Sequence, residues 1–232
     1  MISERLKTLV LMAPSCNTAA DIGTDHGFVP IWLIRENKAS HVIASDLRRG
    51  PLETASAHIA EAGLTDRIET RLGSGLKVLK PEEADLIILA GMGGKLISAL
   101  LSACPDVVSA ASYLLLSPHR DVSDVRGTVE ALSFSIDREE MVEEEGKFYP
   151  IILAVNRPPE RPGTDLEQKY GPCFLREKPE PFLRFLASEA KKKQAVLNKL
   201  EHGRSNQRSE SKRSLIKAEL DEIVSLLPAD RW

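Results

Sequence analysis

The sequence contains few cysteines. It has only three, at Cys16, Cys104 and Cys173. They lie far apart and form no CxxC pair, whereas a small secreted fold held by disulfides needs more cysteines at closer spacing, so we expect a reduced intracellular protein. His41, His58 and His202 also lack partners at metal-ligating spacing, and we expect no metal site.

Long apolar runs are missing as well. No uninterrupted apolar stretch approaches the roughly 20 residues that a membrane span requires. The first residues include Glu4 and Arg5, where a signal peptide would have its apolar centre. We therefore expect a cytoplasmic protein that does not bind a membrane.

Charge is distributed unevenly along the 232 residues, although the net charge is only −3. Residues 1–156 carry 15 basic and 22 acidic side chains, whereas residues 157–232 carry 16 and 12. The change of sign coincides with the Pro-rich stretch "NRPPERPGTD", which begins at Asn156. These features predict a domain over 1–156 and a basic extension over 157–232.

Residues 1–156 alternate between short apolar runs and amphipathic stretches. The runs that suit buried strands are 18–23, 41–46, 67–73, 84–91 and 112–118, and the predicted helices are 4–13, 28–37, 50–63, 94–104 and 122–133. Strands separated by helices imply right-handed crossovers and a mainly parallel sheet. Residues 134–156 contain two strand-like runs joined by "EEEGK", which predicts an antiparallel edge hairpin. The predicted class is α/β, an open doubly wound sheet.

The extension has a helical period. Positions at spacings of three and four, all apolar except Lys193, are Leu183, Leu186, Ala190, Lys193, Leu197 and Leu200, and again Ile216, Leu220, Ile223 and Leu227. The pattern predicts two helices packed as a coiled-coil hairpin. Two helices packed back on the sheet are the alternative, and Lys193 at a core position weakens the coiled-coil interpretation.

The stretch "AADIGTDHGFVPIWLI", residues 19–34, ends the first predicted strand, where ligands bind in open parallel sheets. It lacks GxGxxG and offers only Gly23, flanked by Asp21 and Asp25, whose carboxylates would repel a diphosphate. A GxxxxGK[ST] loop is missing too, because Leu96 follows Gly94-Lys95. An acidic turn suits a cofactor with positive charge and no phosphate, such as S-adenosylmethionine (SAM).

Later strand ends support the same cofactor. Asp46 ends the second strand, where a carboxylate can accept hydrogen bonds from both ribose hydroxyls; the alternative is that it caps the following helix, and the two roles can coexist. The glycines of "RLGSGL" and "ILAGMGGKLI" allow close backbone approach to a ligand, or serve only as turns. The predicted cofactor-binding residues are Asp21, Gly23, Thr24, Asp46, Leu47, Gly73, Gly75, Gly91, Met92 and Gly93.

Five motifs in this order, "ADIGTDHGFVPI", "ASDLRRGPLETA", "RLGSGL", "DLIILAGMGGKLI" and "GKFYPIILA", together with the basic tail, resemble the TrmK family. This family consists of bacterial tRNA methyltransferases that methylate N1 of adenine 22. The resemblance implies a Rossmann-like SAM-dependent methyltransferase domain and a coiled-coil tail that helps to hold tRNA. It also implies Gln-Pro-Asn after the fifth strand, where this chain has Ser117-Pro118-His119, so this turn bears on the choice of acceptor.

The lone pair of adenine N1 attacks a methyl group without prior loss of a proton, so the enzyme needs positioning more than a general base. We predict Asp25 and His26 near the transfer centre, although Asp25 could simply close the turn and His26 could simply pack. The target base must leave its stack, and Phe28, Trp32, Tyr149 or His119 could offer a stacking face, although Phe28 and Trp32 suit the core of the first helix. The predicted tRNA-binding residues are Arg5, Lys95, His119, Arg120, Lys191, Lys192, Lys193, Arg204 and Arg208.

We expect a monomer whose partner is tRNA. Two other functions stay open: a SAM-dependent methyltransferase that acts on another RNA, a protein or a small molecule, and a non-catalytic RNA-binding protein.

Overall fold

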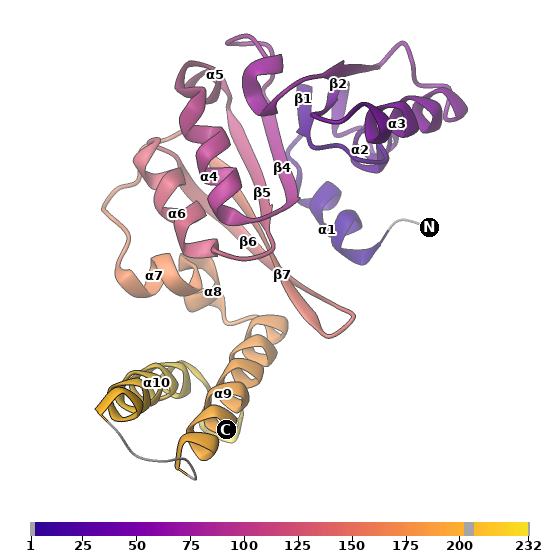
Figure 1. Ribbon diagram of the computed structural model, residues 1–232. Helices are drawn as coiled ribbons and strands as arrows, with labels where there is room; N and C mark the ends of the chain where they lie inside the picture. The colour runs from indigo at the N-terminus through magenta and orange to yellow at the C-terminus, as the bar shows by residue number, and fades with distance from the viewer. Residues whose placement is uncertain (1–2, 202–206, 232) are drawn as a thin grey trace. The chain divides into compact units, whose positions relative to one another are not determined.

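The structure is a computed structural model that describes residues 3–201 and 207–231 (Figure 1). The chain divides into two compact units, Met1–Cys173 and Phe174–Trp232. The division falls later than the predicted boundary at 156. None of the described helices is both long and apolar enough to cross a membrane.

The first unit contains one seven-stranded sheet in the order β3-β2-β1-β4-β5-β7-β6. The strands are β1 (Cys16–Ile22), β2 (Ala39–Asp46), β3 (Ile68–Leu72), β4 (Leu86–Met92), β5 (Tyr113–Pro118), β6 (Ser135–Glu144) and β7 (Lys147–Val155). The first five are parallel, whereas β7 is antiparallel to both β5 and β6. The predicted doubly wound sheet with an antiparallel hairpin at its edge is confirmed.

Helices cover both faces of the sheet, with α1, α2 and α3 on one face and α4, α5 and α6 on the other (Figure 1). Their bounds are α1 (Glu4–Met12), α2 (Phe28–Arg35), α3 (Arg49–Glu61), α4 (Gly94–Ala103), α5 (Pro105–Ala110) and α6 (Val122–Ala131), and a short 3₁₀ helix spans Gly75–Val78. Successive residues of β4 alternate between the two faces, with Leu86 and Ile88 in one buried cluster and Ile87 and Leu89 in the other. Burial on both faces explains why this strand is an unbroken apolar run.

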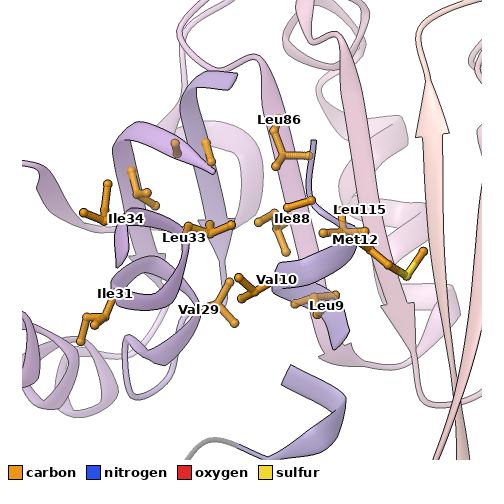
Figure 2. Packing of buried hydrophobic residues seen from close by; sticks show 14 of the residues in the cluster. Leu9, Val10, Met12, Val29, Ile31, Leu33, Ile34, Leu86, Ile88 and Leu115 are labelled. Atoms are coloured by element: carbon orange, nitrogen blue, oxygen red, sulfur yellow. The ribbon is translucent and has the colours of Figure 1, made fainter. Parts of the chain in front are cut away.

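The core between α1, α2 and the sheet holds the first helix in place. The Ser3 hydroxyl caps α1 by accepting a hydrogen bond from the N–H of Leu6. Figure 2 shows Leu9 and Val10 of α1 beside Val29 of α2, with the strand residues behind them. The face of α1 that carries these residues is therefore fixed against the sheet, and this also fixes the start of the helix.

Residues 157–173 belong to the first unit because a buried ion pair gathers their backbone. The Arg126 guanidinium lies 2.9 Å from Glu139 and donates hydrogen bonds to the carbonyls of Gln168, Lys169 and Tyr170. Glu139 also accepts a hydrogen bond from the N–H of Cys173. Two short helices occupy this region, α7 (Asp165–Tyr170) and α8 (Pro172–Glu177). The Pro-rich stretch predicted a boundary, but the chain returns to the sheet after it.

The second unit contains two long helices, α9 (Glu180–Glu201) and α10 (Gln207–Leu226), followed by a 3₁₀ turn at Ala229–Arg231. The two helices pack against each other and bury Leu186, Ala190, Leu197, Leu220 and Ile223. Lys193 is half-buried, and its ammonium pairs with Glu219 across the helix interface. The helical hairpin is confirmed, and coiled-coil supercoiling stays a prediction.

Candidate active site

A cavity of about 610 Å³ opens where β1, β2 and β4 end. The strand order reverses between β1 and β4, and ligands bind at this position in open parallel sheets. The volume lies within the range of small-molecule and cofactor sites. The lining residues that the sequence had singled out as site residues are Arg5, Asp21, Gly23, Thr24, Asp25, His26, Asp46, Leu47, Gly73, Gly75, Gly91, Met92 and His119.

The turn after β1 is held by the neighbouring strand. The carbonyl of Ser45 accepts hydrogen bonds from the N–H groups of Gly23 and Thr24, at 2.8 and 2.9 Å. Gly23 has φ +83°, and a side chain there would approach the Met92 methyl group. The next turn residue, Asp25, is also left-handed at φ +54°. These constraints fix the direction of the turn before any ligand arrives.

Two carboxylates, Asp21 and Asp46, are buried at the floor of the cavity, with exposed fractions of 4% and 7%. Burial raises the pKa of Asp21 to about 6, the nearby Thr24 hydroxyl partly offsets this, and the charge of Asp46 adds to it. Asp46 Oδ1 accepts a hydrogen bond from the N–H of Arg48 at 2.8 Å, but Arg48 is itself the N-cap residue of α3 and no side chain among the described residues caps this helix, so the alternative of a helix cap is not observed. Asp46 is therefore held in place, and both carboxylates line a cavity that favours positively charged or hydroxyl groups.

Glycine is found at two positions after β4, Gly91 and Gly94, for different structural reasons. Gly91 has φ +78° at a register shift between β4 and β5, and a side chain there would meet nothing within 4 Å. Gly94 lies directly against the backbone carbonyls of Arg120 and Asp121, so a side chain cannot fit. Gly91 thus lines the cavity, whereas Gly94 allows α4 to begin close to the end of β5.

One wall of the cavity is apolar. Leu47 and Leu96 line it with exposed fractions of 68% and 52%, and Leu100 lies against Gly75. Gly73 lies in turn against Val78 of the 3₁₀ helix. An exposed apolar wall beside a strand-end carboxylate suits a flat ring with an attached ribose.

Arg5 and His119 also line the cavity, and Tyr149 lies beside both of them. The Arg5 guanidinium lies 3.4 Å from His119 Nε2 and 5.2 Å from the centre of the Tyr149 ring. The His119 ring meets the Tyr149 ring edge-on at 5.4 Å. Burial, with the charges of Arg5 and Lys147, lowers the pKa of His119, so the imidazole is neutral near pH 7.

In the Ser117-Pro118-His119 turn, only His119 lines the cavity. Ser117 is fully buried, and its hydroxyl has no hydrogen-bond partner among the described residues. Ser117 therefore has no direct contact with a molecule in the cavity. Of the two positions at which the turn differs from Gln-Pro-Asn, only the third, His119, lines the cavity.

Asp25 and His26 both line the cavity and are exposed. His26 Nε2 lies 3.4 Å from Asp25 Oδ2. The catalytic roles of these two residues stay predictions.

The other predicted contacts lie elsewhere. Gly93, Lys95 and Arg120, all within the described residues, do not line the cavity. In the second unit Lys191 and Lys192 are exposed, with Lys192 paired to Glu189, whereas Lys193 is committed to Glu219. Arg204 lies outside the described residues, and Arg208 falls in α10 but its side chain is not among those described.

The lining residues that the sequence did not single out are Leu6, Ile22, Val29, Ser45, Ser74, Ala90, Leu96 and Leu100. Ser45 gave one usable signal, because it is a hydroxyl residue directly before the strand-end Asp46 in an otherwise apolar stretch. Leu96 and Leu100 have the apolar character of helix core positions, and Leu100 reaches the cavity where it lies against Gly75.

The polar groups of the cavity fit SAM. The hydroxyl of Ser45 is buried there and has no hydrogen-bond partner among the residues that the structure describes, and the Thr24 hydroxyl lies beside the Asp21 carboxylate. Together with Asp21 and Asp46 they offer oxygen atoms for an ammonium group and ribose hydroxyls. No group of three His, Cys, Asp or Glu side chains among the described residues could hold a metal ion.

The chain is similar to known methyltransferases. A family model described as "Methyltransferase domain" matches residues 2–152. A tRNA (adenine(22)-N(1))-methyltransferase of Bacillus subtilis is 31% identical over 215 residues, which cover 91% of this chain and 90% of the relative.

Solved structures agree with this. The crystal structure of the Bacillus subtilis m1A22 tRNA methyltransferase TrmK has a TM-score of 0.86 at 27% identity, with 98% of this chain and 99% of that chain covered. A Streptococcus pneumoniae protein crystallised with S-adenosyl-L-methionine has a TM-score of 0.87 at 26% identity, with 98% and 100% covered. On the strength of its fold, its acidic cavity and this similarity along almost its whole length, the chain belongs to the tRNA (adenine(22)-N(1))-methyltransferase family.

Proposed function

We propose that this protein transfers the methyl group of SAM to N1 of adenine 22 in tRNA. The observation that carries the proposal is the pairing of Asp21 and Asp46 in one cavity at the strand-order reversal, beside an apolar wall. A diphosphate cofactor would be repelled by these carboxylates, whereas SAM presents an ammonium group to one and ribose hydroxyls to the other. We infer the acceptor, N1 of adenine 22, from the similarity to the Bacillus subtilis tRNA (adenine(22)-N(1))-methyltransferase.

Different residues of the cavity would bind different parts of the cofactor. SAM, when bound, supplies a methyl group on a sulfonium. Asp21, with a pKa of about 6, is ionised at neutral pH and would bind the ammonium group, while Asp46 would accept hydrogen bonds from the ribose. Leu47, Leu96 and Leu100 would cover the adenine ring of the cofactor.

On the acceptor side the residues hold the base rather than remove a proton. N1 of adenine attacks with its lone pair, so the requirement is a fixed approach to the methyl group. His119, neutral and held by Arg5, would contact the base edge, and Asp25 would stabilise the positive charge that develops on it. Exposed cations of the second unit, such as Lys191 and Lys192, would bind the tRNA backbone in the cytoplasm.

The decisive experiment is transfer of labelled methyl groups from SAM to unmodified tRNA, followed by digestion to nucleosides. We expect the label in 1-methyladenosine, and we expect it to disappear when adenine 22 is replaced by guanine. Label in another nucleoside, or none despite intact SAM binding by calorimetry, would reject adenine 22 as the acceptor. SAM binding without transfer to any RNA, protein or small molecule would favour a non-catalytic RNA-binding protein.

A further inference from the structure

Three aromatic rings form a compact cluster at the rim of the cavity, and the outer two, His26 and His58, also lie only 6.2 Å apart at 33°. The rings of His26 and Phe28 lie 5.8 Å apart at 27°, and those of Phe28 and His58 lie 5.3 Å apart at 15°. The rings come from the turn after β1, from the first residue of α2 and from the end of α3. We call His26, Phe28 and His58 the rim stack.

The backbone holds the rim stack in place. Gly27, with φ +73°, lets the turn lie against Ala55 of α3, because a side chain at this position would approach the Ala55 backbone to 3.2 Å. His58 Nδ1 lies 2.8 Å from the carbonyl oxygen of His26. A carbonyl only accepts hydrogen bonds, so Nδ1 carries the proton and donates it. The two helices thus fix the rings before any ligand binds.

Two rings of the rim stack, His26 and Phe28, are exposed, and His58 is half-buried. Phe28 is 40% exposed, and the side chain of His26 is 52% exposed. The expectation that Phe28 is a core residue of the predicted helix 28–37 is therefore wrong. Trp32, one turn later, does pack against the core. His26 and Phe28 line the cavity, whereas His58, within the described residues, does not. The rim stack is therefore a compact aromatic cluster with two rings at the cavity and the third beside them.

We propose that the rim stack is a stacking platform for an unpaired base of the tRNA that flanks the target adenine. This inference rests on the proposed function. The reacting base must reach the interior of the cavity, so its neighbour in the strand meets the rim. Aromatic and imidazole rings are the surfaces on which unpaired RNA bases stack. Arg48, which also lines the mouth and has a 73% exposed side chain, offers a cation for the adjoining phosphate.

The first test compares Phe28→Leu with Phe28→Tyr, which keeps the ring. Loss of one base stack weakens tRNA binding by about 5- to 150-fold, and we expect Phe28→Leu to show a loss in this range in both the Kd and the KM for tRNA. Phe28→Tyr should keep both within about threefold of the wild type. The SAM Kd should be unchanged in both variants, which also shows that they are folded. Leu11→Ala, which removes another exposed apolar side chain outside the cavity, is the control and should change neither Kd.

The second test identifies the base. Transfer RNAs with an abasic nucleotide on either side of adenine 22 are bound to the wild type and to Phe28→Leu. If one flanking base stacks on the platform, its removal weakens binding to the wild type but has little further effect on Phe28→Leu, because the same contact is already lost. Additive losses at both flanks would overturn the proposal, and so would a weakened SAM Kd in Phe28→Leu. Methylation of adenine 22 by the wild type is measured in parallel, so that failure of the proposed function is recognised separately.

Discussion

Arg126 and Glu139 form a fully buried ion pair, with Nε 2.9 Å from Oε1 and side chains that are 3% and 0% exposed. Gly171, with φ +101°, passes directly over both side chains and leaves no room for a side chain of its own. The pair thereby connects α6, β6 and the segment that leads to the second unit. Burial lowers the pKa of Arg126 and the carboxylate opposes this, so each charge depends on the other.

We expect Glu139→Gln to lower the free energy of unfolding by about 3–5 kcal/mol, because it leaves a buried guanidinium without its counter-charge. The double variant Arg126→Met, Glu139→Met should lose less than the sum of the two single variants, because it removes both charges together. The measurement is urea unfolding. Glu140→Gln, which affects the exposed pair Arg138–Glu140, is the matched control and should change stability by less than about 1 kcal/mol. Equal effects of Glu139→Gln and Glu140→Gln would show that the buried pair is dispensable.

Much of the first unit could be predicted from the sequence, because local signals and the architecture agree. The apolar run at 84–91 and the apolar-to-acidic ends at Asp21 and Asp46 follow from burial on both sheet faces and from the ligand edge of a parallel sheet. The residues around 157–177 could not be predicted, since their position depends on the long-range pair Arg126–Glu139. The need for glycine at position 94 could not be predicted either, because it depends on close contact with the backbone carbonyls of Arg120 and Asp121.

Asp46→Ala should weaken SAM binding by about 1–3 kcal/mol, the cost of leaving buried hydroxyl groups without a hydrogen-bond partner. Calorimetric titration of the purified protein with SAM measures this directly. Glu53→Ala, an exposed carboxylate on α3 outside the cavity, is the control and should bind SAM as the wild type does. If Asp46→Ala binds SAM as tightly as the wild type does, Asp46 does not bind the ribose hydroxyls.

SAM affinity should rise with pH through about 6. In the free protein Asp21 is protonated below its raised pKa of about 6 and ionised above it. A bound ammonium group favours the carboxylate and lowers this pKa, so binding releases a proton near and below pH 6 and is weakened by acid there. Calorimetry at several pH values should show this rise in the wild type, and Asp21→Asn should bind more weakly with a flat profile. A wild-type affinity that is constant between about pH 5 and 7.5 would contradict the contact.

Lys191 and Lys192 are adjacent exposed cations of α9, whereas Lys193 pairs with Glu219 of α10. Replacing Lys191 and Lys192 with Gln should weaken tRNA binding and reduce the slope of log K against log salt by about 1 for each lost phosphate contact. Replacing both with Arg keeps the charge and should preserve the slope. If the Gln and Arg variants have the same slope as the wild type, the α9 lysines are not on the phosphate backbone.

His119 allows a test of the turn that departs from the family pattern. Its neutral imidazole accepts from Arg5 at Nε2, and an Asn amide oxygen can accept a hydrogen bond in the same way, whereas a Leu side chain cannot. His119→Asn should therefore retain the kcat/KM for methylation of adenine 22 within a few-fold. His119→Leu should lower kcat/KM by about 5- to 150-fold, because the edge of the base and the Arg5 guanidinium both lose a hydrogen-bond partner. Single-turnover methylation at saturating SAM separates positioning of the base from cofactor binding. If His119→Leu is as active as His119→Asn, the third position of the turn does not contact the acceptor, and the base must be held from the side of Asp25 and His26 instead.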